Sequence, residues 1–220
     1  MLIETEKTEL VELFLNNSVL QFGDFTLKSG RKSPYFFNMG LIKSAHALDR
    51  LCFFYAQSIA RLHPDLDCVI GAAYKGIPLC VMTAHHLSTI LQRDIGFGFN
   101  RKEAKAHGEG GQWVGNSPTA KSVCVDDVIT AGSAVESMMQ LWRENLATPP
   151  LAWVVALDRE EPGTVNKSSA LRQVAERFNM PTISLISLSD VINALDQMEK
   201  SWRIHAQILK SHKQTFSYTA

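Results

Sequence analysis

Two adjacent carboxylates followed by a turn of small residues form the most informative pattern in this sequence. Residues 123–134 read VCVDDVITAGSA, so an apolar run leads into Asp126 and Asp127 and a small-residue turn then opens a helical pattern. Carboxylates can accept hydrogen bonds from sugar hydroxyls, and the free N–H groups at a helix start bind phosphate. The pattern predicts a site for a phosphorylated sugar, although an Asp-Asp pair alone would more often be a helix cap and a turn. The expected phosphate cradle comprises Val128, Ile129, Thr130, Ala131, Gly132, Ser133 and Ala134.

A second turn of small residues leads from another apolar run into a helical pattern. Residues 71–78 read GAAYKGIP, which places Tyr74 and Lys75 between the run and the helix start at Pro78. A lysine beside free N–H groups at a helix start can meet a diphosphate. The alternative is a tight strand-to-helix turn with a solvated lysine.

The third segment with chemical potential is a cationic, glycine-rich loop at residues 101–111, RKEAKAHGEGG. It contains Arg101, Lys102, Lys105 and His107, and its glycines permit large backbone movement. A departing diphosphate gathers negative charge, which a closing cationic loop would stabilise. We expect a lid over the active site, although a run of charges is more often a solvated face.

The elements that must position these segments follow a β-then-α rhythm. Continuously apolar strands separated by helices predict an open, mainly parallel sheet with helices on both faces, and ligands bind beyond the carboxyl ends of such strands. Strands are expected at 68–72, 95–99, 122–125, 153–157 and 182–187. Helices are expected at 5–20, 45–62, 76–92, 132–144 and 189–213, and a small hairpin at 25–28 and 35–38 joined by a turn at 29–31.

Composition limits the classes of function that need to be considered. The chain has 220 residues, for which we expect one domain, and its 22 basic and 22 acidic residues leave no net basic field for nucleic acid. No apolar stretch reaches the roughly 20 residues of a membrane span. The four cysteines lack the spacing of a zinc site and are expected to be reduced core residues. The acidic start resembles no signal peptide, so we expect a cytoplasmic protein.

Two motifs make the chain resemble the orotate phosphoribosyltransferases, a family of type I phosphoribosyltransferases. One is the segment LKSGRKSPYFFN at residues 27–38, and the other is the pattern RKxxKxHGxGG at residues 101–111. The resemblance extends by motif from Phe22 to Arg159 and implies the type I fold over residues 1–220, with residues 1–45 and the C-terminal segment forming a hood. It also implies a homodimer whose lid reaches the neighbouring site. Ala106 and Ser133 depart from the acidic residue and the threonine common in the family.

The resemblance also implies a role for each candidate residue. The implied catalytic residues are Lys102, Lys105, His107, Asp126 and Asp127. Phosphoribosyl diphosphate would be bound by these residues together with Lys28, Tyr74, Lys75, Arg101 and the cradle at residues 128–134. Orotate would be bound by Phe36, Phe37, Thr130 and Arg159, with a ring stacked on the base and the arginine on its carboxylate. Mg²⁺ is the expected cofactor, held mainly by the diphosphate and water rather than by a protein cage.

The implied reaction joins orotate to phosphoribosyl diphosphate, giving orotidine 5-phosphate and diphosphate, a step of pyrimidine biosynthesis. One alternative is a phosphoribosyltransferase for another base, since the two-carboxylate motif is common to the superfamily. A second is a regulator that senses phosphoribosyl diphosphate, although the lid and the balanced charge argue against it. A bifunctional enzyme that also decarboxylates the product would need a barrel domain for which 220 residues leave no room.

Overall fold

The computed structural model describes residues 1–27, 30–101, 112–129, 132–146, 148–162 and 168–215. Its centre is a six-stranded sheet with the order β5-β4-β3-β6-β7-β8. All pairings are parallel except that of β5 with β4, which is antiparallel. The strands are β3 (Cys68–Gly71), β4 (Gly96–Asn100), β5 (Trp113–Gly115), β6 (Ser122–Asp126), β7 (Ala152–Asp158) and β8 (Thr182–Ser187).

The central strands are apolar at successive positions because both faces of the sheet are covered. Val69, Val123 and Val154 pack into one core, which also contains side chains from the first, second and last helices. Their neighbours Ile70 and Cys124 pack into a separate core on the opposite face. Alternate side chains of a strand point to opposite faces, so a strand buried on both sides must be apolar throughout.

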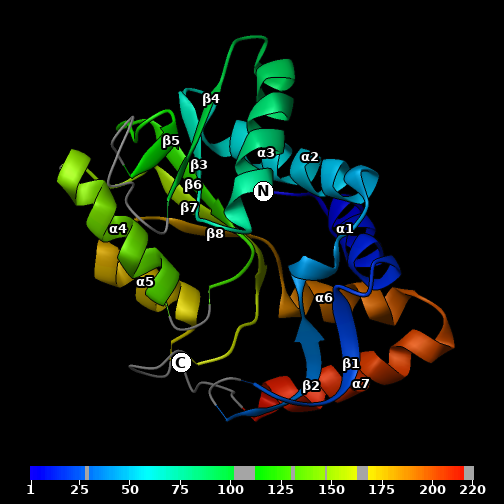
Figure 1. The fold of residues 1–220 in the computed structure, drawn as a ribbon. Helices are drawn as coiled ribbons and strands as arrows, with labels where there is room; N and C mark the ends of the chain where they lie inside the picture. Colours follow the sequence, from blue (N-terminus) through cyan, green and yellow to red (C-terminus); the bar gives the residue numbers. More distant parts are fainter. Residues whose placement is uncertain (28–29, 102–111, 130–131, 147, 163–167, 216–220) are drawn as a thin grey trace.

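The helices divide between the two faces of the sheet, as Figure 1 shows. Helices α4 and α5 lie together on one face, and α1, α2, α3 and α6 lie on the other (Figure 1). The expected open, mainly parallel sheet with helices on both faces is confirmed. The helices are α1 (Glu4–Asn16), α2 (Ala45–Leu62), α3 (Gly76–Leu91), α4 (Ser133–Asn145), α5 (Ala170–Phe178), α6 (Leu188–Gln197) and α7 (Lys200–Gln214), with a short 3-10 turn η1 at Met39–Leu41.

An antiparallel hairpin, β1 (Leu20–Thr26) and β2 (Lys32–Phe37), stands apart from the main sheet and packs against α7 (Figure 1). Phe22 of β1 stacks on His205 with ring centroids 4.2 Å apart, and the ring of Tyr35 meets that of His212 edge-on. Lys7 of α1 forms a 2.9 Å ion pair with Asp190 of α6. The beginning and the end of the chain therefore build one substructure.

Several elements differ from the expectations drawn from sequence. Strand β5 and helix α5 were not expected, and the hairpin strands begin earlier than the expected residues 25 and 35. The expected single C-terminal helix at 189–213 is broken at Met198, where the backbone turns extended, and restarts as α7 after Glu199. All four cysteines are buried and free, as expected.

Candidate active site

The parallel sheet brings four loops to one edge. Strands β4, β3, β6 and β7 are consecutive neighbours, and they end at Asn100, Gly71, Asp126 and Asp158. The carboxyl ends of parallel strands lie at the same edge, where open α/β sheets bind their ligands. The turn that contains Lys75, called here the lysine turn, follows β3, and Arg159 follows β7. The carboxylate pair stands at the end of β6, so the fold gathers three motifs that are far apart in sequence.

Asp126 and Asp127 are nearly enclosed, with 7% and 8% of their surfaces exposed. The backbone N–H of Asp127 donates to Oδ1 of Asp126 at 2.9 Å. Two further bonds fix the backbone here, since the Tyr55 hydroxyl donates to the carbonyl of Asp126 at 2.7 Å and Ala156 N–H donates to that of Asp127 at 2.9 Å. The buried Tyr55 was not anticipated from sequence, because an aromatic residue within α2 gives only the signal of a core position.

Burial and the adjacent Asp127 charge raise the pKa of Asp126 from the ordinary 3.8 to about 7. Removing a carboxylate from water disfavours its charged form, and a neighbouring negative charge acts in the same direction. Near neutral pH this side chain is therefore divided between its charged and neutral forms. Both forms present an oxygen that can accept a hydrogen bond from a sugar hydroxyl.

The turn between β3 and α3 is closely packed because both of its ends are glycines. A Cβ on Gly71 would lie 2.1 Å from the carbonyl oxygen of Gly76, so a larger residue cannot occupy this position without a shift of the backbone. The Ala73–Tyr74 peptide is cis, and the N–H of Ala73 donates to Oδ1 of Asn100 at 2.8 Å. Asn100, to which the sequence pattern assigns no role, thus ties the turn to the end of β4.

Two side chains of this turn reach the surface, those of Tyr74 and Lys75. Tyr74 is 66% exposed. The Lys75 ammonium lies 2.6 Å from Oδ2 of Asp127, which joins the expected diphosphate turn to the expected sugar-binding carboxylates. This contact brings two of the sequence motifs together.

The structure describes only part of the expected phosphate cradle at residues 128–134. Helix α4 begins after Gly132, whose φ of +75° favours glycine, and its first turn closes with a 2.8 Å bond from Glu136 N–H to the Gly132 carbonyl. Ile129 is 6% exposed and belongs to the core beneath α4 and α5, so only its backbone could meet a phosphate. Val128 is partly buried. Thr130 and Ala131, and the side chains of Ser133 and Ala134, lie outside what the structure describes.

The expected lid leaves and rejoins the sheet at one place. The N–H of Arg101 donates to the carbonyl of Gln112 at 2.7 Å, just beyond the β4–β5 pairing. The proposed catalytic residues Lys102, Lys105 and His107 lie outside the described residues, as does Lys28 of the hairpin.

The two phenylalanines expected at the base face opposite sides of β2. Phe36 is 36% exposed and stacks on Phe25 with ring centroids 5.4 Å apart. Phe37 is 8% exposed and packs edge-on against Phe14, which makes it a core residue. Adjacent residues of a strand alternate between faces, so Phe36 is the exposed one of the two rings considered for stacking on the base.

Arg159 follows β7 and reaches the hairpin. Its Nη2 donates to the Ser33 hydroxyl at 3.2 Å and to Oε1 of Glu161 at 2.7 Å. Its guanidinium carbon lies 4.2 Å from the centroid of the Tyr35 ring, a cation–π contact. Sequence reasoning proposed the arginine but missed Glu161, whose only sequence signal is its position two residues further along the chain.

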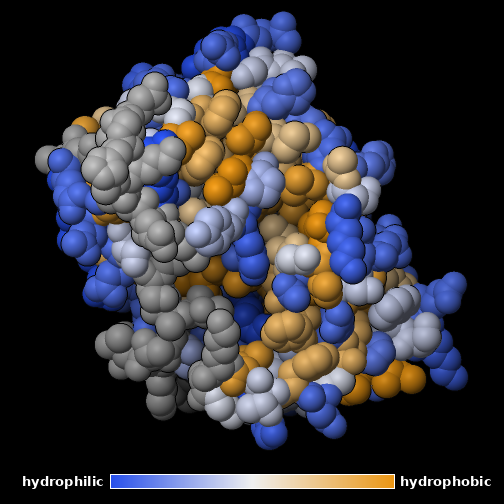
Figure 2. Space-filling view, viewed as in Figure 1, coloured by the Kyte–Doolittle hydropathy of each residue, from blue (hydrophilic) through white to orange (hydrophobic). Residues whose placement is uncertain are grey.

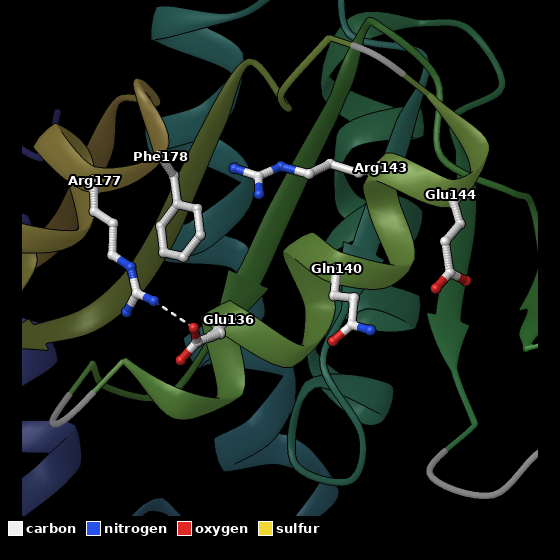
Figure 3. Close-up of a pocket in the computed structure, with 6 residues that line it drawn as sticks. All are labelled: Glu136, Gln140, Arg143, Glu144, Arg177 and Phe178. Carbon is white, nitrogen blue, oxygen red and sulfur yellow. Dashed lines mark hydrogen bonds and ion pairs between the residues drawn. The ribbon is translucent and has the colours of Figure 1, made fainter.

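The surface is hollowed between this edge of the sheet and the hairpin, with hydrophilic residues at the bottom of the hollow (Figure 2). A separate pocket lies elsewhere, between α4 and α5, and is lined by residues that include Glu136, Arg143 and Arg177 (Figure 3). It contains none of the predicted site residues, so it is not the candidate active site.

The described residues contain no cluster of three or more His, Cys, Asp or Glu side chains that could hold a metal ion. Nor does any helix in this part of the chain have the length and apolar character needed to cross a membrane.

Known proteins resemble the chain over nearly its whole length, although no protein-family profile matches it. An orotate phosphoribosyltransferase from Chromohalobacter salexigens is 42% identical, with 97% of this chain and 96% of the relative covered. One from Vibrio cholerae is 44% identical, with 93% and 95% covered. The crystal structure of orotate phosphoribosyltransferase from Francisella tularensis gives a TM-score of 0.80 at 32% identity, covering 94% of this chain and 98% of that one.

A more distant structure shares the fold. Orotate phosphoribosyltransferase from Mycobacterium tuberculosis, solved with 5-phospho-α-D-ribosyl 1-diphosphate, has a TM-score of 0.60 at 19% identity over 84% of this chain. The extent of the first three similarities, together with the strand ends that carry the carboxylate pair, the lysine turn and the arginine, shows that the chain belongs to the orotate phosphoribosyltransferase family.

Proposed function

We propose that this protein transfers the phosphoribosyl group of 5-phospho-α-D-ribose 1-diphosphate to orotate, which yields orotidine 5-phosphate and diphosphate. The observation that carries the proposal is the gathering of Asp126, Asp127 and Lys75 at one sheet edge, with the start of α4 following the carboxylate pair. Carboxylates for a ribose and a helix N-terminus for a phosphate are the two parts that a phosphoribosyl site requires.

The residues of the site would contribute to this reaction mainly by positioning the substrates and by stabilising charge. A ring nitrogen of orotate gives up its proton to solvent and forms a bond to the anomeric carbon as the bond from that carbon to the diphosphate oxygen breaks. Asp126 and Asp127 would accept hydrogen bonds from the ribose hydroxyls and stabilise positive charge developing on the sugar. Lys75, Arg101, Lys102, Lys105 and His107 would meet the negative charge of the leaving diphosphate.

At the base end, Phe36 offers an exposed ring for stacking, and Arg159 has the planar fork that binds a carboxylate through both oxygens. Thr130 would contact the base from the side of the cradle. The core position of Phe37 makes its role one of holding the hairpin in place, with Phe36 as the stacking residue.

Mg²⁺ is part of this proposal as a cofactor that neutralises diphosphate charge when bound. Asp126 and Asp127 supply the oxygen ligands that Mg²⁺ prefers, and one or two carboxylates together with substrate oxygens and water suffice for this ion. The donor set fits the ion. The Lys75 contact with Asp127 means that cation and lysine would compete for one carboxylate until a diphosphate provides further negative charge.

The homodimer, with each lid reaching the neighbouring site, and the cytoplasmic location stay predictions. Mixing two inactive variants tests whether the lid of one subunit serves the site of the other. A Lys105→Ala subunit and an Asp126→Ala subunit, each inactive alone, should regain part of the activity when combined, because one hybrid site then has both residues intact. No recovery in a demonstrated heterodimer would mean that each lid serves its own subunit.

The reaction itself is tested by following orotate absorbance with purified protein, Mg²⁺ and phosphoribosyl diphosphate, with uracil, hypoxanthine and adenine in parallel. Loss of the orotate band that requires every component supports the proposal. Turnover of a different base instead would move the protein to another branch of the superfamily. Binding of phosphoribosyl diphosphate without turnover of any base would favour the sensing regulator.

A further inference from the structure

A buried carboxylate lies beside the arginine proposed for orotate. Glu161 is 6% exposed and accepts hydrogen bonds from Arg159 at 2.7 Å, from Arg31 at 3.1 Å and from the Tyr35 hydroxyl at 3.2 Å. Nε2 of His212 lies 3.4 Å from the same oxygen as Arg159. A charge this far from water is tolerated only when it is paired and hydrogen-bonded, so these partners are what permits it.

Glu161 also holds the surfaces against which Arg159 rests. Tyr35 presents its ring to the guanidinium of Arg159 and its hydroxyl to Glu161. Arg31 joins the hairpin to the loop after β7 by donating to Glu161 and to the carbonyl of Pro162, at 3.1 Å in each case. One carboxylate therefore links Arg159 to the hairpin and, through His212, to α7.

We propose that Glu161 is a positioning residue for base recognition, holding the Arg159 guanidinium in the orientation that receives the orotate carboxylate. This inference rests on the proposed function. A guanidinium has five N–H donors, and Glu161 and Ser33 both engage the same nitrogen, Nη2. An arginine already held in one conformation loses little further freedom when substrate binds.

The charge state of Glu161 is consistent with this role. Burial favours a raised pKa, but the hydrogen bond and charge of Arg159, with His212 and Arg31, outweigh burial and hold the pKa below its ordinary value. Glu161 is thus a carboxylate throughout the neutral range. The opposite role would be competition, in which Glu161 neutralises Arg159 and weakens its attraction for orotate, and the two roles predict opposite changes in the orotate KM.

Glu161→Gln tests the proposal because it keeps the shape and one acceptor oxygen but removes the charge. We expect the KM for orotate to rise roughly tenfold, which corresponds to about 1.4 kcal/mol. The KM for phosphoribosyl diphosphate and the kcat at saturating orotate should change by less than about threefold, because positioning of the base acts on its binding. A purely structural defect would instead affect both substrates and kcat.

Glu160→Gln is the matched control. Glu160 is the adjacent acidic residue and also binds the C-terminal segment, accepting from Lys213 at 2.9 Å and from the N–H of Ser189 at 2.7 Å. None of the described contacts of Glu160 involves Arg159. The KM of the Glu160→Gln variant for orotate should therefore stay at the wild-type value. Tyr35→Phe gives a second variant that keeps the ring beneath Arg159 and removes one donor to Glu161, for which we expect a smaller rise.

An orotate KM in Glu161→Gln that is unchanged or lowered would overturn the inference, as would an equal rise in Glu160→Gln. If Glu161→Gln fails to fold, as judged by circular dichroism, an unchanged orotate KM in Tyr35→Phe would overturn it. Wild-type protein without activity on orotate would instead overturn the proposed function, so the two failures are distinguishable.

Discussion

Replacing Asp126 with asparagine should stabilise the protein at alkaline pH while it removes most of the activity. Burial and the charge of Asp127 raise the pKa of Asp126 from 3.8 to about 7 in the folded state. The folded state therefore holds this proton more tightly than the unfolded chain does. The resulting stability is fully present below about pH 4 and is lost as pH rises through about 7.

The magnitude follows from the difference between the two pKa values. Each pKa unit corresponds to about 1.4 kcal/mol, so full ionisation of Asp126 costs about 4 kcal/mol of unfolding free energy above about pH 8. At about pH 5 the loss is only about 2 kcal/mol, because the carboxyl of the folded protein is still protonated. Asparagine resembles the protonated form, and its Oδ1 can still accept from the N–H of Asp127.

Guanidinium unfolding of the wild type and of Asp126→Asn, at matched ionic strength from about pH 5 to about pH 8.5, measures this difference. The variant should be the more stable protein, with an advantage that grows by about 2 to 3 kcal/mol across that range. Contributions of titrating groups that do not interact with Asp126 cancel in the comparison. A difference that does not vary with pH would refute the reasoning, and activity on orotate measured in parallel should fall because a ribose acceptor has lost its charge.

Four further substitutions have expected outcomes. Phe37→Ala should lower the free energy of unfolding by about 3–5 kcal/mol in denaturant titrations, as buried aromatic truncations do, whereas Phe36→Ala should lower it by less than about 1 kcal/mol and raise the orotate KM in steady-state assays. Similar losses of stability in both would contradict the assignment of opposite faces. Lys105→Ala should reduce kcat roughly 10²–10³-fold with an unchanged unfolding midpoint, and normal turnover would remove this lysine from the mechanism. Gly71→Ala should weaken binding of phosphoribosyl diphosphate in a calorimetric titration, because the new Cβ would meet the Gly76 carbonyl at 2.1 Å, and wild-type affinity would show that the turn adapts.

The sheet was predictable from sequence because its strands are buried on both faces. An uninterrupted run such as residues 153–157 cannot belong to a half-exposed strand, and the intervening helical spacing then requires parallel connections. Strand β5 was missed because three residues give no periodicity, and only the pairing with β4 identifies them. Helix α5 had a usable signal, since Ser169 caps it and Leu171, Val174 and Phe178 are its buried residues.

The candidate site was predictable only where one segment contains the whole pattern. Asp126 and Asp127 lie in one continuous motif, so their position at the end of β6 followed from the strand itself. Asn100, Tyr55 and Glu161 act through contacts between segments that lie 27 to 130 residues apart. Such contacts depend on the tertiary fold, and a single sequence has no local feature that reports them.

The joining of the two ends of the chain has a consequence for biosynthesis. Lys7 pairs with Asp190 across 183 residues, and Phe22 stacks on His205. At the usual rate of about 5–20 residues per second, the hairpin emerges from the ribosome on the order of ten seconds or more before the helix on which it rests. The hairpin side chains that contact α7, such as Phe22, remain without their partner for that time. A nascent chain stalled shortly before residue 200 would therefore contain β1 to β8 and still lack α7, whose His205 and His212 rings contact the hairpin.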